Sequence, residues 1–462
     1  MHKYTLTFLQ ILLITCSLQA QQVRPFKNGD RVVFMGNSIT DGGHYHSYIW
    51  LYYLTRFPQM RISVFNAGIG GDVSGQMFDR LEEEVFAKKP TLMTLTFGMN
   101  DTGYQFVPGA KADSVYNEKI ALSLANFTKI EAALLRHPEI TKVMIASSPY
   151  DETAKIKARA LVGKNKAMLK IANAQQQAAA KHGWSFVDFN RPMTIINRLQ
   201  QQRDSAYTME GADRIHPTND GHMVMAYLFL KAQGLAGKKV AAVNINVPTL
   251  GTTTDNCKIS MLRGNIKDMA FNYLAGSLPY PVDTIGRGAN SPTRSQADGL
   301  KLVPFTQEFN QELLTVKGLP SGKNYELLID GKMIGNWSAE AFAQGINLAT
   351  CVNTPQYQQA LALMHINEER WELERRLREY YWLQYQVLKP KGLLHNDGLA
   401  TVDSLKKYAR KDFFVAVTLP TYQRARFKAV RDTWQQEIDL LTSQMYVINQ
   451  PVTHHFEIKI AS

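Results

Sequence analysis

Ser38 stands where an open α/β fold would expose a nucleophile. The apolar residues 32–35 predict a buried strand, which Gly36 ends before a tight turn that carries Asn37 and Ser38. Ligands bind at the carboxyl ends of the strands in such sheets, so a serine there presents its hydroxyl at the binding edge. Because many serines in such turns only cap helices, a catalytic role requires a base and an oxyanion site elsewhere in the chain.

The sequence offers a base at His216, three residues after Asp213. On a single turn the Asp213 carboxylate can accept a hydrogen bond from Nδ1–H of the imidazole, which leaves Nε2 free to take a proton from a serine. Pro217 fixes the backbone directly after the histidine and can open a helix. We therefore predict that Asp213 and His216 form an imidazole–carboxylate couple.

Two further segments offer hydrogen-bond donors for an oxyanion. Asn100 follows the apolar run 92–97, and its side-chain amide can donate into a cleft at the end of that strand. The segment 66–72 is rich in glycine, which lets a backbone N–H approach a ligand closely. It lacks the Lys-Ser/Thr of a phosphate-binding P-loop and the glycine spacing of a dinucleotide site. Which of Gly68, Gly70 and Gly71 would donate stays open from the loop alone.

Four blocks in this order resemble those of the SGNH (GDSL-type) hydrolase family, and the resemblance covers about residues 30–237. The blocks are Gly36-Asn37-Ser38-Ile39-Thr40, Gly71 in its Gly-Gly-Asp turn, Gly98-Met99-Asn100-Asp101 and Asp213-Arg214-Ile215-His216. One departure is Asn37, where the family name has Asp. The resemblance implies a flavodoxin-like three-layer α/β/α fold with a parallel sheet, and ester hydrolysis without a metal or another cofactor.

The resemblance also implies the roles of individual residues. Ser38 would be the nucleophile, His216 the general base and then acid, and Asp213 its orienting partner. The backbone N–H groups of Ser38 and Gly71 and the side chain of Asn100 would form the oxyanion hole. The α/β-hydrolases share the order Ser, Asp, His, but their Gly-x-Ser-x-Gly elbow is absent around Ser38.

Aromatic and polar residues near the proposed nucleophile and oxyanion donor indicate the substrate class. His44 and Tyr45 follow Ser38, and Tyr104 follows Asn100, so we expect these three side chains to contact substrate. Such groups suit sugar rings, and the sequence shows no hydrophobic lid, so an acetylated glycan is the expected ester. A lipase, lysophospholipase or thioesterase of the same family is the alternative. An inactive glycan-binding protein is an alternative of another class.

Strand and helix patterns alternate from about residue 30 to residue 237, which predicts a parallel sheet covered by helices. The predicted strands are 31–35, 62–66, 92–97, 142–146 and 184–188, and the predicted helices are 47–56, 75–87, 114–135, 158–182 and 221–233. We expect a hydrolase domain over 21–240.

The remainder, 241–462, predicts a smaller α+β region that is β-rich to about residue 350 and then forms long helices. Strands are expected at 313–316 and 325–329, with a hairpin turn at Asp330-Gly331, and a last strand at 455–460. Helices are expected at 355–387 and 424–445.

Composition bounds the possible partners. The 462 residues carry a formal net charge of +12, but Lys and Arg form no dense block and no nucleic-acid motif occurs, so we expect no nucleic-acid partner. Oligomeric state stays open.

Residues 1–20 resemble a secretory signal, with Lys3, an apolar middle and a small-residue cleavage site ending at Ala20. No other segment predicts a membrane helix, so we expect an exported, periplasmic or extracellular protein without stable membrane insertion; lipid anchoring at Cys16 is the minor alternative. Export would permit a disulfide between Cys257 and Cys351, although two separate thiols fit equally well.

Overall fold

The computed structural model describes residues 22–106, 111–286 and 294–461, and of residues 111–113 only the backbone. The predicted signal segment 1–20 and Cys16 lie outside the described residues. The first half of the chain forms a five-stranded parallel sheet in the order β2-β1-β3-β4-β5. This is the flavodoxin-like order, confirming the predicted fold class. The strands are β1 (Arg31–Gly36), β2 (Ser63–Gly68), β3 (Leu92–Phe97), β4 (Thr141–Ala146) and β5 (Ser185–Asp188).

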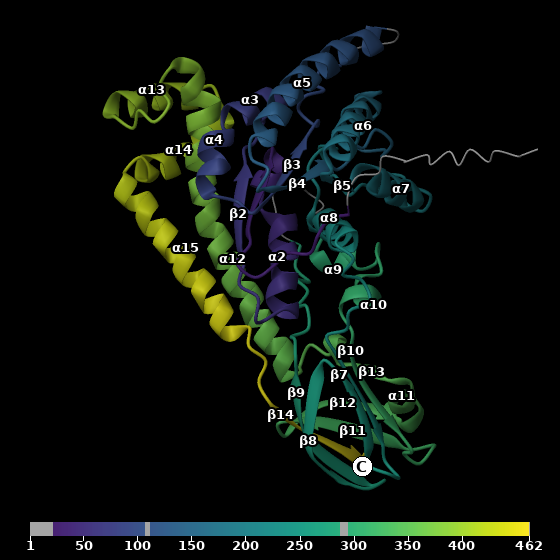
Figure 1. The fold of residues 1–462 in the computed structure, drawn as a ribbon. Coiled ribbons are helices and arrows are strands. Elements are labelled where there is room, and N and C mark those ends of the chain that lie inside the picture. The colour runs from purple at the N-terminus through teal and green to yellow at the C-terminus, as the bar shows by residue number, and fades with distance from the viewer. Residues whose placement is uncertain (1–21, 107–110, 287–293, 462) are drawn as a thin grey trace, which may run out of the picture.

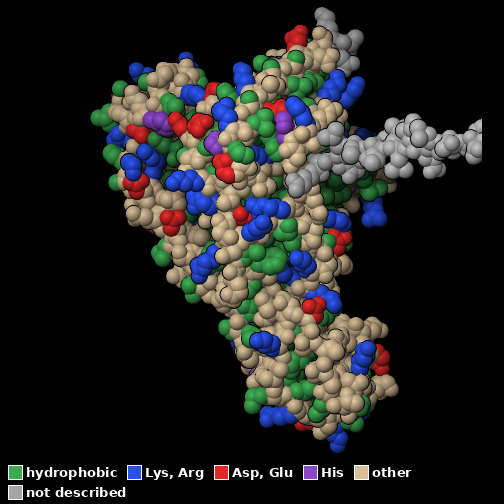
Figure 2. All heavy atoms as spheres, in the orientation of Figure 1, with side chains coloured by type: hydrophobic (Ala, Val, Ile, Leu, Met, Phe, Trp, Pro, Cys, Tyr) green, Lys and Arg blue, Asp and Glu red, His purple; other side chains and the backbone are tan. Residues whose placement is uncertain are grey.

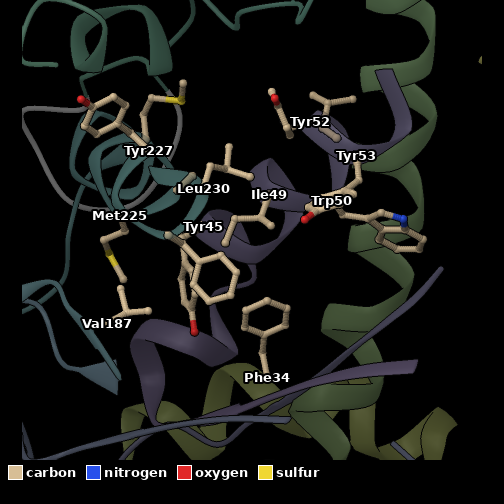
Figure 3. Packing of buried hydrophobic residues seen from close by; sticks show 14 of the residues in the cluster. Phe34, Tyr45, Ile49, Trp50, Tyr52, Tyr53, Val187, Met225, Tyr227 and Leu230 are labelled. Carbon is tan, nitrogen blue, oxygen red and sulfur yellow. The ribbon is translucent and has the colours of Figure 1, made fainter. Parts of the chain in front are cut away.

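Helices cover both faces of this sheet, which explains why its strands are continuously apolar. Along β1, Val32 and Phe34 face one hydrophobic cluster, whereas Val33 and Met35 face the other. Figure 3 shows the first cluster, where Phe34 packs beside residues of α2 and α8. The helices of that face are α2 (His44–Arg56), α7 (Asn190–Gln201) and α8 (Asn219–Ala232). Those of the other face are α3 (Ser74–Asp79), α4 (Leu81–Glu84), α5 (Lys111–Leu135) and α6 (Lys164–His182).

The predicted elements of this half differ from the structure mainly at their ends. The helix predicted over 75–87 is broken into α3, α4 and a 3₁₀ turn, η1 (Phe86–Lys88), because Arg80 leaves helical geometry between the first two. The helix predicted from residue 158 begins at Lys164, after Gly163 with a φ of 86°. Helix α7 was not predicted. A four-residue helix, α1 (Ser38–Asp41), directly follows β1.

The β-rich part forms two sheets around a shared core, at the bottom of Figure 1. The strand orders are β13-β10-β6-β7 and β12-β11-β14-β9-β8. The predicted hairpin is present: Asp330 and Gly331 both have positive φ, 49° and 75°, between β11 and β12. The bounds are β6 (Ala241–Asn246), β7 (Gly251–Asp255), β8 (Cys257–Gly264), β9 (Asp268–Ala275), β10 (Glu312–Lys317), β11 (Asn324–Ile329), β12 (Lys332–Ser338), β13 (Ile346–Asn347) and β14 (His454–Ile460).

Short helices link these strands: α9 (Gln296–Gly299), α10 (Phe305–Phe309), α11 (Ala339–Gln344) and the 3₁₀ turn η2 (Leu348–Thr350). The last strand, β14, returns to the β-rich part and pairs with β9 and β11. The long helices are therefore inserted between strands of one β-rich unit rather than appended after it.

The helical part lies against the parallel-sheet domain (Figure 1). It consists of α12 (Pro355–Trp382), the π-helical turn η3 (Leu383–Leu388), the 3₁₀ turn η4 (Lys389–Lys391), α13 (Leu399–Ala409), α14 (Phe413–Ala425) and α15 (Lys428–Ile448). Helices α12 and α15 lie side by side. The π-helical turn widens the helix end of the predicted 355–387 element.

On the face in Figure 2, Lys and Arg side chains are scattered among acidic and apolar ones rather than gathered in one patch. In the described part of the chain, no helix is long and apolar enough to cross a membrane. Cys257 and Cys351 are both free and half-buried, so this structure contains the two separate thiols and not the disulfide.

Candidate active site

Ser38 lies where β1 passes into α1. A Cβ on Gly36 would stand 2.2 Å from the Thr40 hydroxyl, so only glycine allows the chain to turn this tightly. Asn37 caps α1: its Oδ1 accepts a hydrogen bond from the Ile39 N–H at 3.1 Å. The Asn that stands where the family name has Asp therefore has a capping role, and Ser38 becomes the first helical residue.

Ser38, His216 and Asp213 form one hydrogen-bonded chain. The Ser38 hydroxyl oxygen lies 2.8 Å from His216 Nε2, and His216 Nδ1 lies 2.6 Å from Asp213 Oδ2. Asp213 Oδ1 also accepts the backbone N–H groups of Ile215 and His216. Burial disfavours the charged form of Asp213, but these hydrogen bonds outweigh it and hold the pKa of the carboxyl below its ordinary value. The carboxylate is therefore ionised and fixes the imidazole with Nε2 toward the serine.

Arg214 shapes the turn between these two residues. Its φ is 69°, a left-handed conformation that is costly for a residue with a Cβ. The buried guanidinium donates to the carbonyl oxygens of Ala158 and Asp151 at 2.8 and 2.9 Å, which anchors the turn to the loop after β4. Arg214 thus holds Asp213 within reach of the His216 ring.

The backbone N–H groups of Ser38 and Gly71 have no acceptor among the described residues. The neighbouring N–H groups in the glycine-rich loop are all used. Gly68 donates to Asn66 Oδ1, Ile69 to the Gly36 carbonyl, Gly70 to Asp41 Oδ2 and Asp72 to the Ile69 carbonyl. Of the three glycines considered from the sequence, Gly71 is therefore the one with a free donor, and both free donors belong to residues that line one pocket.

Asn100 supplies a side-chain donor to the same pocket. Its Nδ2 donates to the Asp72 carbonyl at 2.9 Å, and its Oδ1 accepts the Tyr104 hydroxyl at 2.6 Å. This fixes which end of the amide is nitrogen and leaves the second Nδ2 hydrogen for a ligand. Lys164 fixes the loop that carries Asn100, because its buried Nζ donates to the Met99 and Gly103 carbonyls and to the Thr102 hydroxyl.

Asp101 has a structural role in this loop. Its carboxylate accepts hydrogen bonds from the Gly98 and Ser74 N–H groups at 3.0 and 2.9 Å and from the Ser123 hydroxyl. These bonds tie the end of β3 to α3 and α5 and so fix the backbone that carries Asn100.

The pocket over Ser38 has a volume of about 610 Å³ and is built from two parts of the chain. The parallel-sheet domain contributes the residues already described. The helical part contributes residues of α12, η3 and α14. The lining residues are Ser38, Asp41, Gly42, Gly70, Gly71, Asn100, Tyr104, Ile215, His216, Arg375, Arg378, Glu379, Trp382, Gln386, Phe414, Val417 and Thr418.

Known protein families match both the parallel-sheet domain and the helical part. The model of the GDSL-like lipase/acylhydrolase family matches residues 34–224, and that of the diltiazem deacetylase C-terminal helical domain matches residues 361–450. The solved structure of a gut microbial diltiazem-metabolizing enzyme is 49% identical, covers 95% of this chain and 99% of its own, and superimposes with a TM-score of 0.91. The chain belongs to the GDSL-like lipase/acylhydrolase family. It is a carboxylic ester hydrolase, as its sequence predicted.

A second relative of this hydrolase matches the first half alone. The acetylxylan esterase of Geobacillus stearothermophilus is 25% identical over 223 residues, which are 45% of this chain and 95% of that protein. The helical part is thus a feature that this GDSL-like hydrolase shares with the diltiazem-metabolizing enzyme.

Two residues predicted to contact substrate do not line the pocket of the hydrolase. Tyr45 is only 1% exposed and packs beside Phe34 in the core, as Figure 3 shows, with its hydroxyl 3.1 Å from that of Thr40. His44 packs against His222 and Trp371 with tilted rings, each ring centroid 5.0 Å away, and lines a second pocket of about 350 Å³. The prediction for Tyr45 is wrong, because α2 begins at His44 and places the Tyr45 side chain in the core, whereas the prediction for His44 is not supported at the pocket over Ser38.

Sequence reasoning also missed the wall formed by α14. Phe414 and Val417 are exposed and line the pocket, which contradicts the expectation that no hydrophobic cover exists. Pro420 within the helix and the β-prone run before it obscured the element. The two consecutive aromatic residues Phe413 and Phe414 were the available signal in the sequence. Of the predicted contacts, Tyr104 alone lies on the pocket.

Among the residues that the structure describes, no cluster of three or more His, Cys, Asp or Glu side chains could hold a metal ion. Asp41 lies on the pocket, and burial raises its pKa to about 6 despite the nearby Arg378 guanidinium. Its carboxylate accepts a hydrogen bond from the Gly70 N–H and so helps to hold the glycine-rich loop in place.

Proposed function

We propose that this hydrolase is an exported serine esterase that removes acetyl groups from ring-containing alcohols. The observation that carries the proposal is the hydrogen-bonded chain from Ser38 through His216 to Asp213. It lies at a pocket that is also lined by Gly71 and Asn100, which with Ser38 supply the three oxyanion donors. Export rests on the signal-like residues 1–20 and stays part of the proposal, as does a periplasmic or extracellular location.

The geometry supports an acyl-enzyme mechanism. His216 Nε2 takes the Ser38 proton as the hydroxyl oxygen attacks the ester carbonyl. Ser38 N–H, Gly71 N–H and Asn100 Nδ2–H then donate to the developing oxyanion, and losing one such donor costs about 10²–10³ in turnover. His216 returns the proton to the departing alkoxide, and the alcohol leaves. Water, deprotonated by His216, cleaves the acyl group from Ser38 and restores the serine.

Two comparisons support a short acyl group, since one relative is an acetylxylan esterase and residues 361–450 of this chain match a domain named for a diltiazem deacetylase. The pocket walls bear on the alcohol. Tyr104 of the parallel-sheet domain and Trp382, Phe414 and Val417 of the helical part line the pocket. Planar apolar surfaces of this kind bury ring systems well. We therefore favour acetate esters of compact, largely apolar ring alcohols over long-chain lipids.

An acetylated oligosaccharide, the substrate expected from the sequence, is the second candidate. It is favoured by the acetylxylan esterase relative and by Arg375 and Glu379, whose charged groups on the pocket can bond sugar hydroxyls beside the aromatic walls. A lipase, lysophospholipase or thioesterase activity has less support, because the acetylxylan esterase relative and the deacetylase domain both point to acetyl esters. An inactive binding protein fits poorly with an assembled Ser–His–Asp chain.

A substrate panel with paired variants tests the proposal. For purified wild type, kcat/KM should fall from p-nitrophenyl acetate to the butyrate and octanoate, and should be higher for 1-naphthyl acetate than for acetylated xylobiose. Ser38→Ala should abolish every activity. Phe414→Ala should raise KM for 1-naphthyl acetate about tenfold, as expected for losing the burial of one aromatic side chain.

The matched control is Phe413→Ala, which removes a neighbouring exposed ring that does not line the pocket. It should leave KM unchanged. A preference for octanoate would overturn the acetyl assignment. A higher kcat/KM for acetylated xylobiose than for 1-naphthyl acetate would replace the first candidate with the second.

A further inference from the structure

The peptide that carries the Gly71 N–H is held by a side chain from the other half of the hydrolase. Trp382, the last residue of α12, donates its indole Nε1–H to the Gly70 carbonyl oxygen at 3.1 Å. In a trans peptide the C=O of one residue and the N–H of the next point in opposite directions. Fixing the Gly70 carbonyl toward Trp382 therefore fixes the Gly71 N–H on the opposite side of the same peptide plane.

The neighbouring peptides of the loop are fixed within the parallel-sheet domain. Asp41 Oδ2 accepts the Gly70 N–H at 3.0 Å, and the Ile69 carbonyl accepts the Asp72 N–H at 3.2 Å. Only the peptide between Gly70 and Gly71 has its carbonyl bonded to the helical part and its N–H without an acceptor among the described residues.

That peptide is also the one best able to rotate. Glycine flanks it on both sides, and Gly71 has a φ of 87°, a region that glycine enters without strain. Rotation of the peptide plane would turn the Gly70 carbonyl oxygen toward the site and the Gly71 N–H away from it. A carbonyl dipole in that place would repel the oxyanion that the N–H should stabilise. Something must therefore select between the two orientations.

We propose that Trp382 is a positioning residue of the oxyanion hole, so that the C-terminal helical part takes part in catalysis and not only in forming the pocket wall. This inference rests on the roles given to Ser38 and Gly71 in the proposed function. The indole hydrogen bond selects the peptide orientation in which the Gly71 N–H is available to the substrate oxygen.

A second contact from the π-helical turn supports the same loop. Gln386 Nε2 donates to Asp72 Oδ1 at 2.6 Å, and Gln386 Oε1 accepts a hydrogen bond from Gln76 at 3.1 Å. A Cβ on Gly71 would lie only 3.8 Å from the Gln386 amide, so the turn is packed directly on this glycine. The buried Arg80 holds the other oxygen of Asp72 at 2.6 Å. The loop is thus held between Arg80, at the end of α3, and η3, and Trp382 bonds to its rotatable peptide.

The chain offers a matched control for this hydrogen bond. Trp371, on the same helix and equally half-buried, donates its Nε1–H to the Gly42 carbonyl at 3.0 Å. Trp371→Phe and Trp382→Phe each remove one indole N–H and one hydrogen bond between the same two parts of the chain. Only the second removes a bond to the oxyanion loop. The melting temperatures of the two variants should fall by similar amounts.

Steady-state kinetics on p-nitrophenyl acetate separate positioning from general loosening. Trp382→Phe should lower kcat at least tenfold with KM changed less than twofold, whereas Trp371→Phe should keep kcat within about twofold. Phenylboronic acid, which forms a tetrahedral adduct on the serine, should bind Trp382→Phe more weakly by the same factor as the loss in kcat. Replacing the indole of Trp382 by its benzothiophene isostere, which lacks only the N–H, should reproduce the kinetic loss with unchanged shape.

The inference is overturned if both Phe variants lose kcat equally, or if the benzothiophene variant keeps wild-type kcat and boronate affinity. Ser38→Ala separates this result from failure of the proposed function. If Ser38→Ala is inactive while the two Phe variants behave alike, the nucleophile stands and the role of Trp382 falls. If Ser38→Ala keeps full activity, the proposed function itself falls.

Discussion

The Tyr104 hydroxyl donates a hydrogen bond to Asn100 Oδ1 over 2.6 Å. Because an Asn side chain presents an acceptor on one end and a donor on the other, this bond turns the amide nitrogen toward the pocket. Tyr104 is 44% exposed, so the bond orients the amide without burying the ring. The residue predicted to contact substrate also orients an oxyanion donor.

Tyr104→Phe should therefore lower kcat about fivefold, the equivalent of one hydrogen bond of about 1 kcal/mol. The melting temperature should stay within about 1 °C, since an exposed hydroxyl contributes little to stability. Kinetics on p-nitrophenyl acetate measure the loss. Phe106→Leu, at an equally exposed ring that does not line the pocket, is the control. Unchanged kcat in Tyr104→Phe would show that Asn100 keeps its orientation unaided.

The left-handed backbone of Arg214 predicts an unusual order of stabilities. Arg214→Ala and Arg214→Gly both remove the hydrogen bonds to Ala158 and Asp151, and both should lower kcat. Only glycine adopts a φ of 69° without strain, so Arg214→Gly should be about 1 kcal/mol more stable than Arg214→Ala. Urea unfolding measures the difference. Equal stabilities, or the reverse order, would mean that the turn relaxes in the variants.

Lys164 makes the stability of the hydrolase depend on pH. Burial lowers the pKa of Lys164 to about 7, whereas an unfolded lysine titrates near 10.4. Between about pH 7 and pH 10 the unfolded chain holds a proton that the folded chain has released. The free energy of unfolding should therefore rise with pH across this window, by up to about 1.4 kcal/mol per unit.

Lys164→Met should remove that rise and lower stability by about 2–3 kcal/mol at pH 7, because three acceptors lose their donor. Urea unfolding of wild type and variant at several pH values gives the two slopes. Lys166→Met changes an exposed lysine nearby and should run parallel to wild type. Parallel curves for Lys164→Met would refute the assignment.

A buried ion pair joins α12 to α4. Arg378 and Glu84 are 4% and 3% exposed and lie 2.6 Å apart. Arg378→Met leaves the Glu84 carboxylate buried without its partner and should cost about 3–5 kcal/mol, whereas Arg378→Met with Glu84→Met should recover most of it. The exposed pair of Lys428 and Asp432 is the control, and Lys428→Met should cost less than about 1 kcal/mol. An additive loss in the double variant would contradict the coupling.

The parallel-sheet half could be predicted because its signals are local. Each strand is a short apolar run ended by Gly, Asn or Pro, and the residues with chemistry follow those ends. The order β2-β1-β3 places the loops after all three strands at one edge, which is why Ser38, Gly71 and Asn100 meet.

The wall of the pocket could not be predicted in the same way. Nothing in the sequence around Trp382 indicates that it contacts Gly70, since their 312-residue separation is bridged only by tertiary packing. Tyr45 and His44 illustrate the converse: adjacency to Ser38 in the sequence does not place a side chain in the site, because helix α2 rotates each residue by about 100° from the last.

Ser38 should carry the acyl group during turnover. Rapid mixing of the hydrolase with p-nitrophenyl acetate, followed by acid quenching and mass spectrometry of the peptides, tests this directly. We predict a burst of p-nitrophenol of up to one equivalent per active site where deacylation limits turnover, and one acetyl group on the peptide that contains Ser38. An acetyl group on a different residue, or full turnover by Ser38→Ala, would contradict the account.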